Sequence, residues 1–365
     1  MNFFYTHISK KAHARVKEVL TTSFISAGKL SDEFENELAA KLGMVNPICL
    51  NSGTSALHLG LEVAGIGCDD EVILPPQTFI ASGLSILMAG AKPVFADIQY
   101  ETGNIDPKSI EKKITEKTKA IMPVHWAGYP CDMDEISKIA KIHNLIVIED
   151  AAHALGAVYK EKSIGSVSDY TCFSFQAIKH LTTGDGGALC CLNKEKYIEA
   201  KNRSWFGIDR ENSKPSILGE REYELTTLGF KFHLNDYAAA LGIANLEDIS
   251  YILGRRREIA EIYRSELINI PGLRLLDYQN DRESAYWLFT ILVENRIEFI
   301  KKLLSRKIPS SVVHLGIDKY SIFGGHNPGL LNQVKFDEHQ VSIPVHSDLS
   351  DEDVDLIIHT IKEGW

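Results

Sequence analysis

Short apolar runs alternate with helix-like segments over most of the chain, and this alternation limits the folds that the chain can adopt. The runs are 48–50, 71–74, 93–96, 120–122 and 145–148. Continuous apolar runs separated by helices are typical of parallel strands that are buried on both faces of a sheet. The pattern therefore predicts a doubly wound α/β domain, with a mostly parallel sheet covered by helices. Ligands of such sheets bind at the carboxyl ends of the strands.

The pattern changes after about residue 246. A charged amphipathic helix is expected to begin at 255–260, shorter apolar runs follow at 287–293 and 341–343, and a last helix is expected at 350–363. We therefore predict a large domain, residues 1–246, and a smaller C-terminal α+β domain, residues 247–365. The segment 208–225 is rich in charged residues and contains Pro and Gly, which predicts a long mobile loop.

Length and composition exclude several classes of protein. A chain of 365 residues is long enough for two domains, and 44% hydrophobic with 24% charged residues is typical of a soluble globular protein. The net charge of -10 argues against a nucleic-acid partner, because phosphate binding needs a basic face. No stretch approaches the roughly 20 apolar residues of a membrane span, and the N-terminus does not resemble a signal peptide. The six cysteines form no C-x-x-C pair, so we expect reduced, buried thiols and a cytoplasmic protein.

Lys179 is the first candidate for a catalytic residue. It follows an apolar segment, 173–178, and it precedes the glycine-rich loop 182–187. This order predicts that the amine lies at the end of a strand, in a cleft with little water. Burial there favours the neutral amine over the ammonium, and a neutral amine is what Schiff-base chemistry requires.

Further polar and aromatic residues stand at predicted strand ends. The turn 52–55, Ser-Gly-Thr-Ser, begins a helix, where free N–H groups and hydroxyls suit a phosphate, although by itself it could be a plain helix cap. Asp150 ends a strongly apolar run and would need a cationic partner if buried, and Phe79 could be either an aromatic plate or core packing. Together with Ser174 and Lys179, these groups match the needs of pyridoxal phosphate.

Two other kinds of site are weakly indicated. The loop 65–70 begins like a dinucleotide-binding loop, but it lacks the third glycine and follows a helix instead of a strand. His143, Asp150 and His153 could form a metal site by chance, but the histidines show no metal-binding spacing, so we predict no metal.

From about Ser26 to the C-terminus the chain resembles the sugar aminotransferase family known as DegT/DnrJ/EryC1/StrS. This family has the aspartate-aminotransferase-like fold of pyridoxal-phosphate-dependent transferases, fold type I. The matching segments are 50–57, 123–125, 131–134, 149–156, 173–175 with Lys179, 182–187, 235–236 and 238–242.

The resemblance implies roles for these residues. Lys179 would bind the cofactor covalently and move the proton during catalysis, and Asp150 would keep the pyridine nitrogen protonated. Phe79 would stack on the ring, and His153, where the family often has glutamine, would lie near the 3′-oxygen. The implied phosphate ligands are Thr54, Ser55 and Ser174.

The family also implies a homodimer with shared active sites. Lys231 stands where the family commonly has an asparagine that reaches the phosphate in the neighbouring subunit. A lysine could do so as a point charge, or it could be an ordinary surface residue. Asp185 replaces a glutamate common in the family, and we attach no role to it.

The resemblance predicts an aminotransferase that passes an amine from an amino acid, glutamate, to a keto sugar for amino-sugar biosynthesis. A nucleotide-linked keto-deoxysugar is expected, although a free keto sugar, the identity of the nucleotide and the choice of C3 or C4 stay open. The expected substrate residues are Tyr129, Trp205, Arg210, His314 and Lys319, of which Trp205 could simply pack a loop.

Two alternatives share the same fold. The pyridoxamine-phosphate-dependent sugar dehydratases carry histidine in place of the lysine, and here His180 directly follows Lys179. A shift of one residue in the alignment would reverse the assignment, but the spacing from Ser174 favours Lys179. A non-catalytic, cofactor-binding regulatory member is the other alternative, and the complete set of cofactor residues argues against it.

Overall fold

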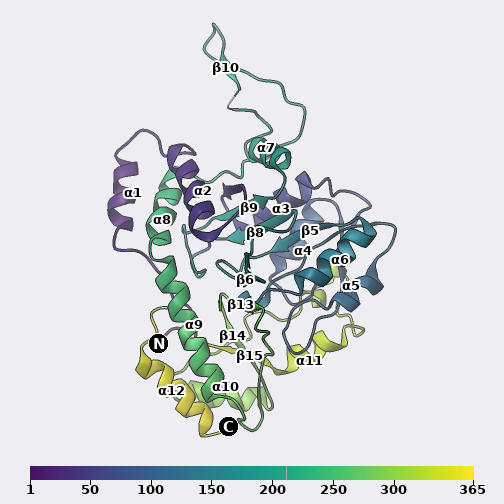
Figure 1. Cartoon of the computed structure of the whole chain (residues 1–365), viewed down its shortest axis with the longest axis vertical. Coiled ribbons are helices and arrows are strands. Elements are labelled where there is room, and N and C mark those ends of the chain that lie inside the picture. Colours follow the sequence, from purple (N-terminus) through teal and green to yellow (C-terminus); the bar gives the residue numbers. More distant parts are fainter. Residues whose placement is uncertain (211) are drawn as a thin grey trace.

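The computed structural model describes residues 1–210 and 212–365, and its central element is a seven-stranded sheet (Figure 1). The strand order is β1-β9-β8-β5-β4-β2-β3. The strands are β1 (Pro47–Leu50), β2 (Glu71–Leu74), β3 (Lys92–Phe95), β4 (Thr118–Ile121), β5 (Ile146–Asp150), β8 (Tyr170–Ser174) and β9 (Gly187–Cys191). All neighbouring pairs are parallel except those of β9, which runs antiparallel to both β1 and β8. The predicted mostly parallel sheet is therefore confirmed.

Helices cover both faces of this sheet and form a separate core on each. Val147 and Ile148 are consecutive in β5, and they belong to different cores because side chains alternate along a strand. The core of one face includes residues of α2 (Lys29–Leu42), α6 (Met133–His143) and α8 (Asp236–Leu246). The core of the other face includes residues of α3 (Gly53–Val63), α4 (Ile80–Met88) and α7 (Lys194–Arg203). The remaining helices of this part are α1 (Ala12–Leu20), which packs on α8, and α5 (Pro107–Lys113).

Side-chain caps fix where several of these helices begin. Ser52 precedes α3 and its hydroxyl oxygen accepts the backbone N–H of Ser55 at 3.0 Å. Asn235 caps α8 in the same way through the N–H of Ala238. Such caps satisfy donors that have no partner within the helix. The cap at Ser52 places the start of α3 directly after β1, at the carboxyl edge of the sheet.

The C-terminal part has its own sheet and core. Its antiparallel strands lie in the order β12 (Leu273–Leu275), β14 (Phe289–Val293), β15 (Gln340–Ile343). The helices are α9 (Ile249–Glu266), α10 (Arg296–Ser305), α11 (Leu331–His339) and α12 (Asp351–Lys362), with short 3-10 turns η2 (Ile317–Lys319) and η3 (Ser321–Phe323). The expected α+β composition agrees with these elements.

The proposed boundary near residue 246 is crossed by other segments. Phe4, at the N-terminus, stacks on Trp287 at 5.4 Å between ring centroids. A small sheet joins β13 (Arg282–Glu283) to β6 (Val158–Tyr159) and β7 (Lys162–Ser163). The two parts therefore pack together through backbone pairing and through the N-terminal segment.

The segment predicted as a loop, 208–225, contains a short hairpin of β10 (Lys214–Pro215) and β11 (Arg221–Glu222), and residue 211 lies outside the described residues. Figure 1 shows this segment projecting from the body of the molecule beyond α7. Among the described residues, no helix is long and apolar enough to cross a membrane. Five of the six cysteines are buried and all six are free thiols.

Candidate active site

A cavity of about 530 Å³ lies at the carboxyl edge of the large sheet. It receives residues that follow β1, β2 and β4, and the last residues of β5 and β8. Residues of the C-terminal part complete its wall. The lining residues most relevant to chemistry are Ser52, Gly53, Thr54, Thr78, Phe79, Asp150, His153, Ser174, Lys179, Asp185, Trp287, Ser311, Val313 and His314.

Lys179 lines this cavity, but it does not stand at the end of a strand as we predicted. β8 ends at Ser174, and Lys179 belongs to the turn that follows, where its N–H donates to the carbonyl of Gln176 at 2.9 Å. Its Nζ lies 3.6 Å from the ring centroid of Trp287. Burial lowers the pKa of Lys179 to about 7, and the nearby Asp150 opposes this shift. A substantial fraction of the amine is therefore unprotonated near neutral pH.

The neighbouring histidine is directed elsewhere. His180 is buried outside the cavity, and its Nε2 donates to the carbonyl of Ala285 at 2.8 Å. The side chain that faces the cavity is therefore the lysine, which disfavours the alternative based on a histidine at this position.

Asp150 is held at the cavity by two hydrogen bonds. The hydroxyl of Ser82, in α4, donates to Oδ2 at 2.7 Å, and the N–H of Ala152 donates to Oδ1 at 3.1 Å. Thr78, which lines the cavity, has its hydroxyl 2.7 Å from that of Ser82. These contacts fix the orientation of the carboxylate while leaving each oxygen further capacity to accept a proton donor.

A small cup suited to an anion lies where α3 begins. Ser52, Gly53, Thr54 and Ser174 line the cavity here, and the first N–H groups of a helix have no acceptor within it. A Cβ at Gly53 would approach the Cβ of Ser174 to 2.9 Å, so only glycine allows this close approach. Ser55 does not line the cavity, because its hydroxyl donates to Oδ1 of Asn51 at 2.6 Å. Ser52 occupies the place that we expected for Ser55.

Aromatic rings and imidazoles form the opposite wall. Phe79 is 51% exposed at the mouth of the cavity, with its ring 5.2 Å from that of His314. His153 stacks on Trp287 at 3.8 Å, and its buried Nδ1 has no hydrogen-bond partner among the described residues. Burial lowers the pKa of His314 to about 4 and that of His153 well below its usual range, with Lys179 adding to both shifts. Both imidazoles are therefore neutral near pH 7.

His314 is carried by a strained loop with strong internal support. The preceding residue, Val313, has φ of 56°, which is unfavourable for a β-branched side chain. The carbonyl of His314 accepts hydrogen bonds from the side-chain amides of Gln77 at 3.1 Å and Gln340 at 2.7 Å. Gln333 in turn donates to Gln77 at 2.7 Å. This buried network holds His314 against the cavity.

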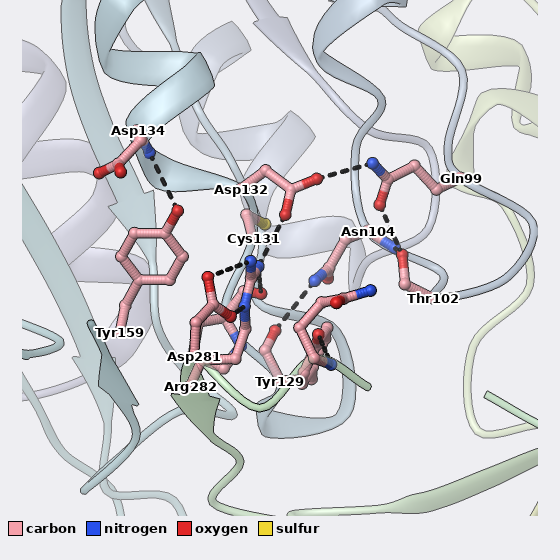
Figure 2. Close-up of polar contacts among 12 residues, drawn as sticks. Gln99, Thr102, Asn104, Tyr129, Cys131, Asp132, Asp134, Tyr159, Asp281 and Arg282 are labelled. Atoms are coloured by element: carbon pink, nitrogen blue, oxygen red, sulfur yellow. Dashed lines mark hydrogen bonds and ion pairs between the residues drawn. The ribbon is translucent and has the colours of Figure 1, made fainter. Parts of the chain in front are cut away.

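Tyr129 and Lys319 do not line this cavity, so the structure does not bring them together with the other predicted site residues. The ring of Tyr129 stacks on Tyr278 at 3.9 Å, and its hydroxyl oxygen accepts the N–H of Gln279 at 2.7 Å. Figure 2 shows Tyr129 beside Arg282, at the junction of the two parts. Lys319 is exposed, with its Nζ 5.3 Å from the ring centroid of Tyr320.

Trp205, Arg210 and Lys231 lie together on another surface, which we call the basic face. Trp205 and Arg210 line a second cavity of about 260 Å³. The guanidinium of Arg210 lies 4.7 Å and Nζ of Lys231 5.7 Å from the ring centroid of Trp205, and Lys231 pairs with Trp205 through a β-bridge. None of the three lines the first cavity of its own chain.

The residues of the first cavity fit pyridoxal phosphate. The unpartnered Nδ1 of His153 offers a group to a ligand oxygen, the cup at Gly53 suits a phosphate, and Asp150 and Lys179 face the same space. Among the described residues, no group of three His, Cys, Asp or Glu side chains could hold a metal ion. His143 is exposed on α6, whereas Asp150 and His153 are buried.

Several residues of the site were missed from the sequence. Trp287 was placed only in an apolar run, but it precedes β14 and contacts the lysine. Ser82 stands three residues after Phe79, and helical spacing could have placed its hydroxyl near a strand end. Ser52 and Thr78 are close in sequence to residues that were predicted for the site. The sequence around Val313 has no pattern that indicates a site.

Comparisons with known proteins agree with this geometry. The model of the DegT/DnrJ/EryC1/StrS aminotransferase family matches residues 6–362. The Bacillus subtilis spore coat polysaccharide biosynthesis protein SpsC is 37% identical, over 98% of this chain and 95% of SpsC. The GDP-perosamine synthase of Escherichia coli O157:H7 is 33% identical, over 98% of this chain and 96% of that protein. The solved structure of the sugar aminotransferase CalS13 from Micromonospora echinospora has a TM-score of 0.95 and 31% identity, with 100% of both chains covered.

The strand-end cavity, its lysine and carboxylate, and these similarities lead to one conclusion. The chain belongs to the DegT/DnrJ/EryC1/StrS aminotransferase family and is an enzyme of the pyridoxal-phosphate-dependent sugar aminotransferase class.

Proposed function

We propose that the protein transfers an amine from L-glutamate to a nucleotide-linked keto-deoxysugar. The observation that carries this proposal is that Lys179, Asp150 and the anion cup at Gly53 face one cavity. The low pKa of Lys179, about 7, supports a role that requires a free amine.

Pyridoxal phosphate would be held by Lys179, Asp150, His153, Phe79 and the cup formed by Ser52, Gly53, Thr54 and Ser174. When bound, the cofactor supplies a carbonyl group for the amine and a ring that withdraws electrons from the reacting carbon. The rest of the chemistry falls to the side chains of the chain.

Each side chain has a separate task. Lys179 accepts a proton at Nζ and later returns one, because an amine with a pKa of about 7 can do both near neutral pH. Asp150, fixed by Ser82 and Ala152, holds the proton of the ring nitrogen. Neutral His153 offers a hydrogen bond to the ring oxygen without adding a positive charge.

The proposed substrates are anions, and the cavity offers few cations to bind them. Among its described lining residues the only Lys or Arg is Lys179, whereas Asp150 and Asp185 are acidic. A donor carboxylate and a nucleotide diphosphate both need cationic or multiple N–H partners. We therefore propose that the protein is a homodimer, and that the basic face of one copy (Trp205, Arg210 and Lys231) completes the cavity of the other.

The sugar acceptor would contact the wall formed by Phe79, Val313 and His314. The network of Gln77, Gln333 and Gln340 supports this assignment, because it holds His314 at the cavity by its backbone. Similarity to a GDP-perosamine synthase supports a nucleotide-linked sugar and makes a guanosine nucleotide the first to test. Uridine- and thymidine-linked sugars are the necessary comparisons.

The first experiment is the absorbance spectrum of purified protein, before and after L-glutamate is added. We expect a visible band from the lysine-bound cofactor, which disappears as the pyridoxamine form accumulates. A protein that takes up no pyridoxal phosphate would contradict the proposal and favour a non-catalytic member. Bound cofactor that does not respond to glutamate would reject glutamate as donor, and a screen of other amino acids would follow.

A second experiment addresses the acceptor. The pyridoxamine form is prepared with glutamate, freed of it, and mixed with GDP-, UDP- or dTDP-linked 4-keto-6-deoxysugars. Return of the visible band identifies the acceptor without any coupled reaction. If a free keto sugar restores the band as rapidly as each linked sugar, the nucleotide is not recognised.

A further inference from the structure

Glu149 and Asp150 are consecutive carboxylates at the end of β5, and they lie on opposite faces of the sheet. Side chains alternate along a strand, so when Asp150 faces the cavity, Glu149 faces the other side. Glu149 is 1% exposed and is absent from the lining of the first cavity. The proposed function assigns it no task.

The contacts of Glu149 are hydrogen bonds from neighbouring strands. Its Oε2 lies 2.7 Å from Nε2 of His125, which follows β4, and its Oε1 accepts the hydroxyl of Thr171, in β8, at 3.1 Å. His125 and Thr171 are as fully buried as Glu149. The backbone N–H of Cys131 donates to Nδ1 of His125 at 3.1 Å.

These contacts determine the protonation states. Because Nδ1 of His125 accepts a hydrogen bond, it carries no proton, and the single proton of the ring is on Nε2. His125 is therefore neutral and donates to Glu149. Both oxygens of Glu149 then accept hydrogen bonds, which is the arrangement of an ionised carboxylate.

Burying an ionised carboxylate in this position costs free energy of folding, because no cation pairs with it. Among the described residues, the only group within ion-pair distance of Glu149 is the neutral His125. A cavity of about 240 Å³ reaches Glu149 on this face, and its lining includes Tyr159, Lys160 and Lys162. The ammonium of Lys160 is paired with Asp134, and Lys162 is exposed. A side chain that only linked neighbouring strands by hydrogen bonds could do so without a charge. The charge of Glu149 therefore indicates a further role.

We propose that Glu149 is a second negative charge behind Asp150, and that it helps to keep the ring nitrogen of the cofactor protonated. This inference depends on the proposed binding of pyridoxal phosphate. A negative charge across one strand, with little water between, raises the proton affinity of groups on the cavity side. Asp150 contacts the nitrogen directly, whereas Glu149 acts through the field that it adds.

The test compares the affinities of two cofactors for the same protein. Pyridoxal phosphate has a ring nitrogen that can be protonated, and 1-deazapyridoxal phosphate has a C–H group in its place. Wild-type apoprotein should prefer pyridoxal phosphate. Glu149→Gln keeps the size of the side chain and removes its charge, and the preference should fall by roughly tenfold, the order of magnitude expected for one unit charge that acts across a strand in a protein interior.

Matched variants separate charge from structure. Glu71→Gln removes another buried carboxylate, at the start of β2 at the other end of the same sheet, and should leave the preference unchanged. Glu149→Asp keeps the charge and should keep the preference, even if both affinities fall. Asp150→Asn should abolish the preference. If Glu149→Gln does not fold, the double variant Glu149→Met, Thr171→Val removes the charge together with one of its hydrogen-bond donors, and it should lower the preference by a similar factor.

The outcomes are distinct. If Glu149→Gln weakens both cofactors equally, Glu149 is only a clamp between strands and the inference is wrong. Loss of the preference in Glu149→Asp would also overturn it, because the charge is still there. If wild-type protein binds neither cofactor, the proposed function itself fails, and this result is visible before any variant is made.

Discussion

The strand-end cavity and the basic face each contain a lysine, but the two lysines lie in opposite surroundings. Lys179 lies in the cavity, where burial lowers its pKa to about 7 and leaves a reactive amine. Lys231 is exposed to water beside Trp205 and Arg210. The difference teaches that burial separates the two lysines, and it underlies our proposal that the buried one carries a proton and the exposed one binds an anion.

Replacing the buried lysine should have the largest effect. In Lys179→Ala, we expect turnover to fall by roughly 10⁴-fold, the upper end of what a positioned acid–base group contributes. The fold should be intact, because the side chain lines a cavity and its removal deletes only the contact of its amine with the ring of Trp287 among the contacts described. Steady-state rates with glutamate and the keto sugar measure the loss, and circular dichroism checks the fold. Turnover close to that of the wild type would show that Lys179 does not carry the proton, and the contrast between Lys179 and Lys231 would then have no functional meaning.

Replacing the exposed lysine should have a smaller effect that depends on the second copy. Loss of one charged contact to phosphate in Lys231→Ala should weaken cofactor binding by roughly tenfold. Lys301→Ala removes an exposed lysine of α10 and serves as the matched control. Fluorescence titration of the apoprotein with pyridoxal phosphate measures the difference.

Mixed dimers sharpen this second prediction. If sites are shared, a dimer of Lys179→Ala and Lys231→Ala copies contains one site with both replacements and one site with neither. At a pyridoxal phosphate concentration that saturates the wild type but not Lys231→Ala, mixing the two variants should then give more activity than the sum of the two variants measured separately. Absence of any restoration, in a mixture shown to exchange subunits, would place Lys231 outside the site.

The last prediction needs no mutation and concerns the pH at which the amine of Lys179 becomes reactive. Because the pKa of Lys179 is lowered to about 7, its amine loses its proton as pH rises through 7, whereas an ordinary lysine does so near 10.5. In the apoprotein, the rate of labelling of Lys179 by an amine-reactive reagent should therefore rise with a midpoint near 7. Peptide mass spectrometry follows each lysine separately. A midpoint near 10 would mean that the cavity does not favour the neutral amine.

The cofactor cavity was largely predictable from local patterns. Asp150, Thr54, Phe79 and Ser174 follow or end apolar runs, and the rule that ligands bind at the carboxyl ends of parallel strands brings them together. Ser55 does not line the cavity, whereas Ser52, three residues earlier, does; the sequence does not show which hydroxyl of the turn is bound to Asn51. The proposed roles of these residues await the experiments above.

The substrate residues were much less predictable. Tyr129 was expected in the substrate site, but stacking on Tyr278 and a hydrogen bond from Gln279 bury it at the junction of the two parts. Trp287 and Val313 reach the cavity from the C-terminal part, far away in sequence. Contacts of this kind depend on how separate elements pack, and no local pattern records them.

The sequence by itself determined the order of strands and helices, the mostly parallel sheet and the set of strand-end residues, because hydrophobic periodicity and turn residues act over short distances. Only the tertiary structure decided that Trp287 contacts the amine of Lys179, and that Glu149 and His125 form a buried pair behind Asp150. The physical reason is that the burial and the electrostatic environment of a side chain are set by packing against segments that are distant in the sequence.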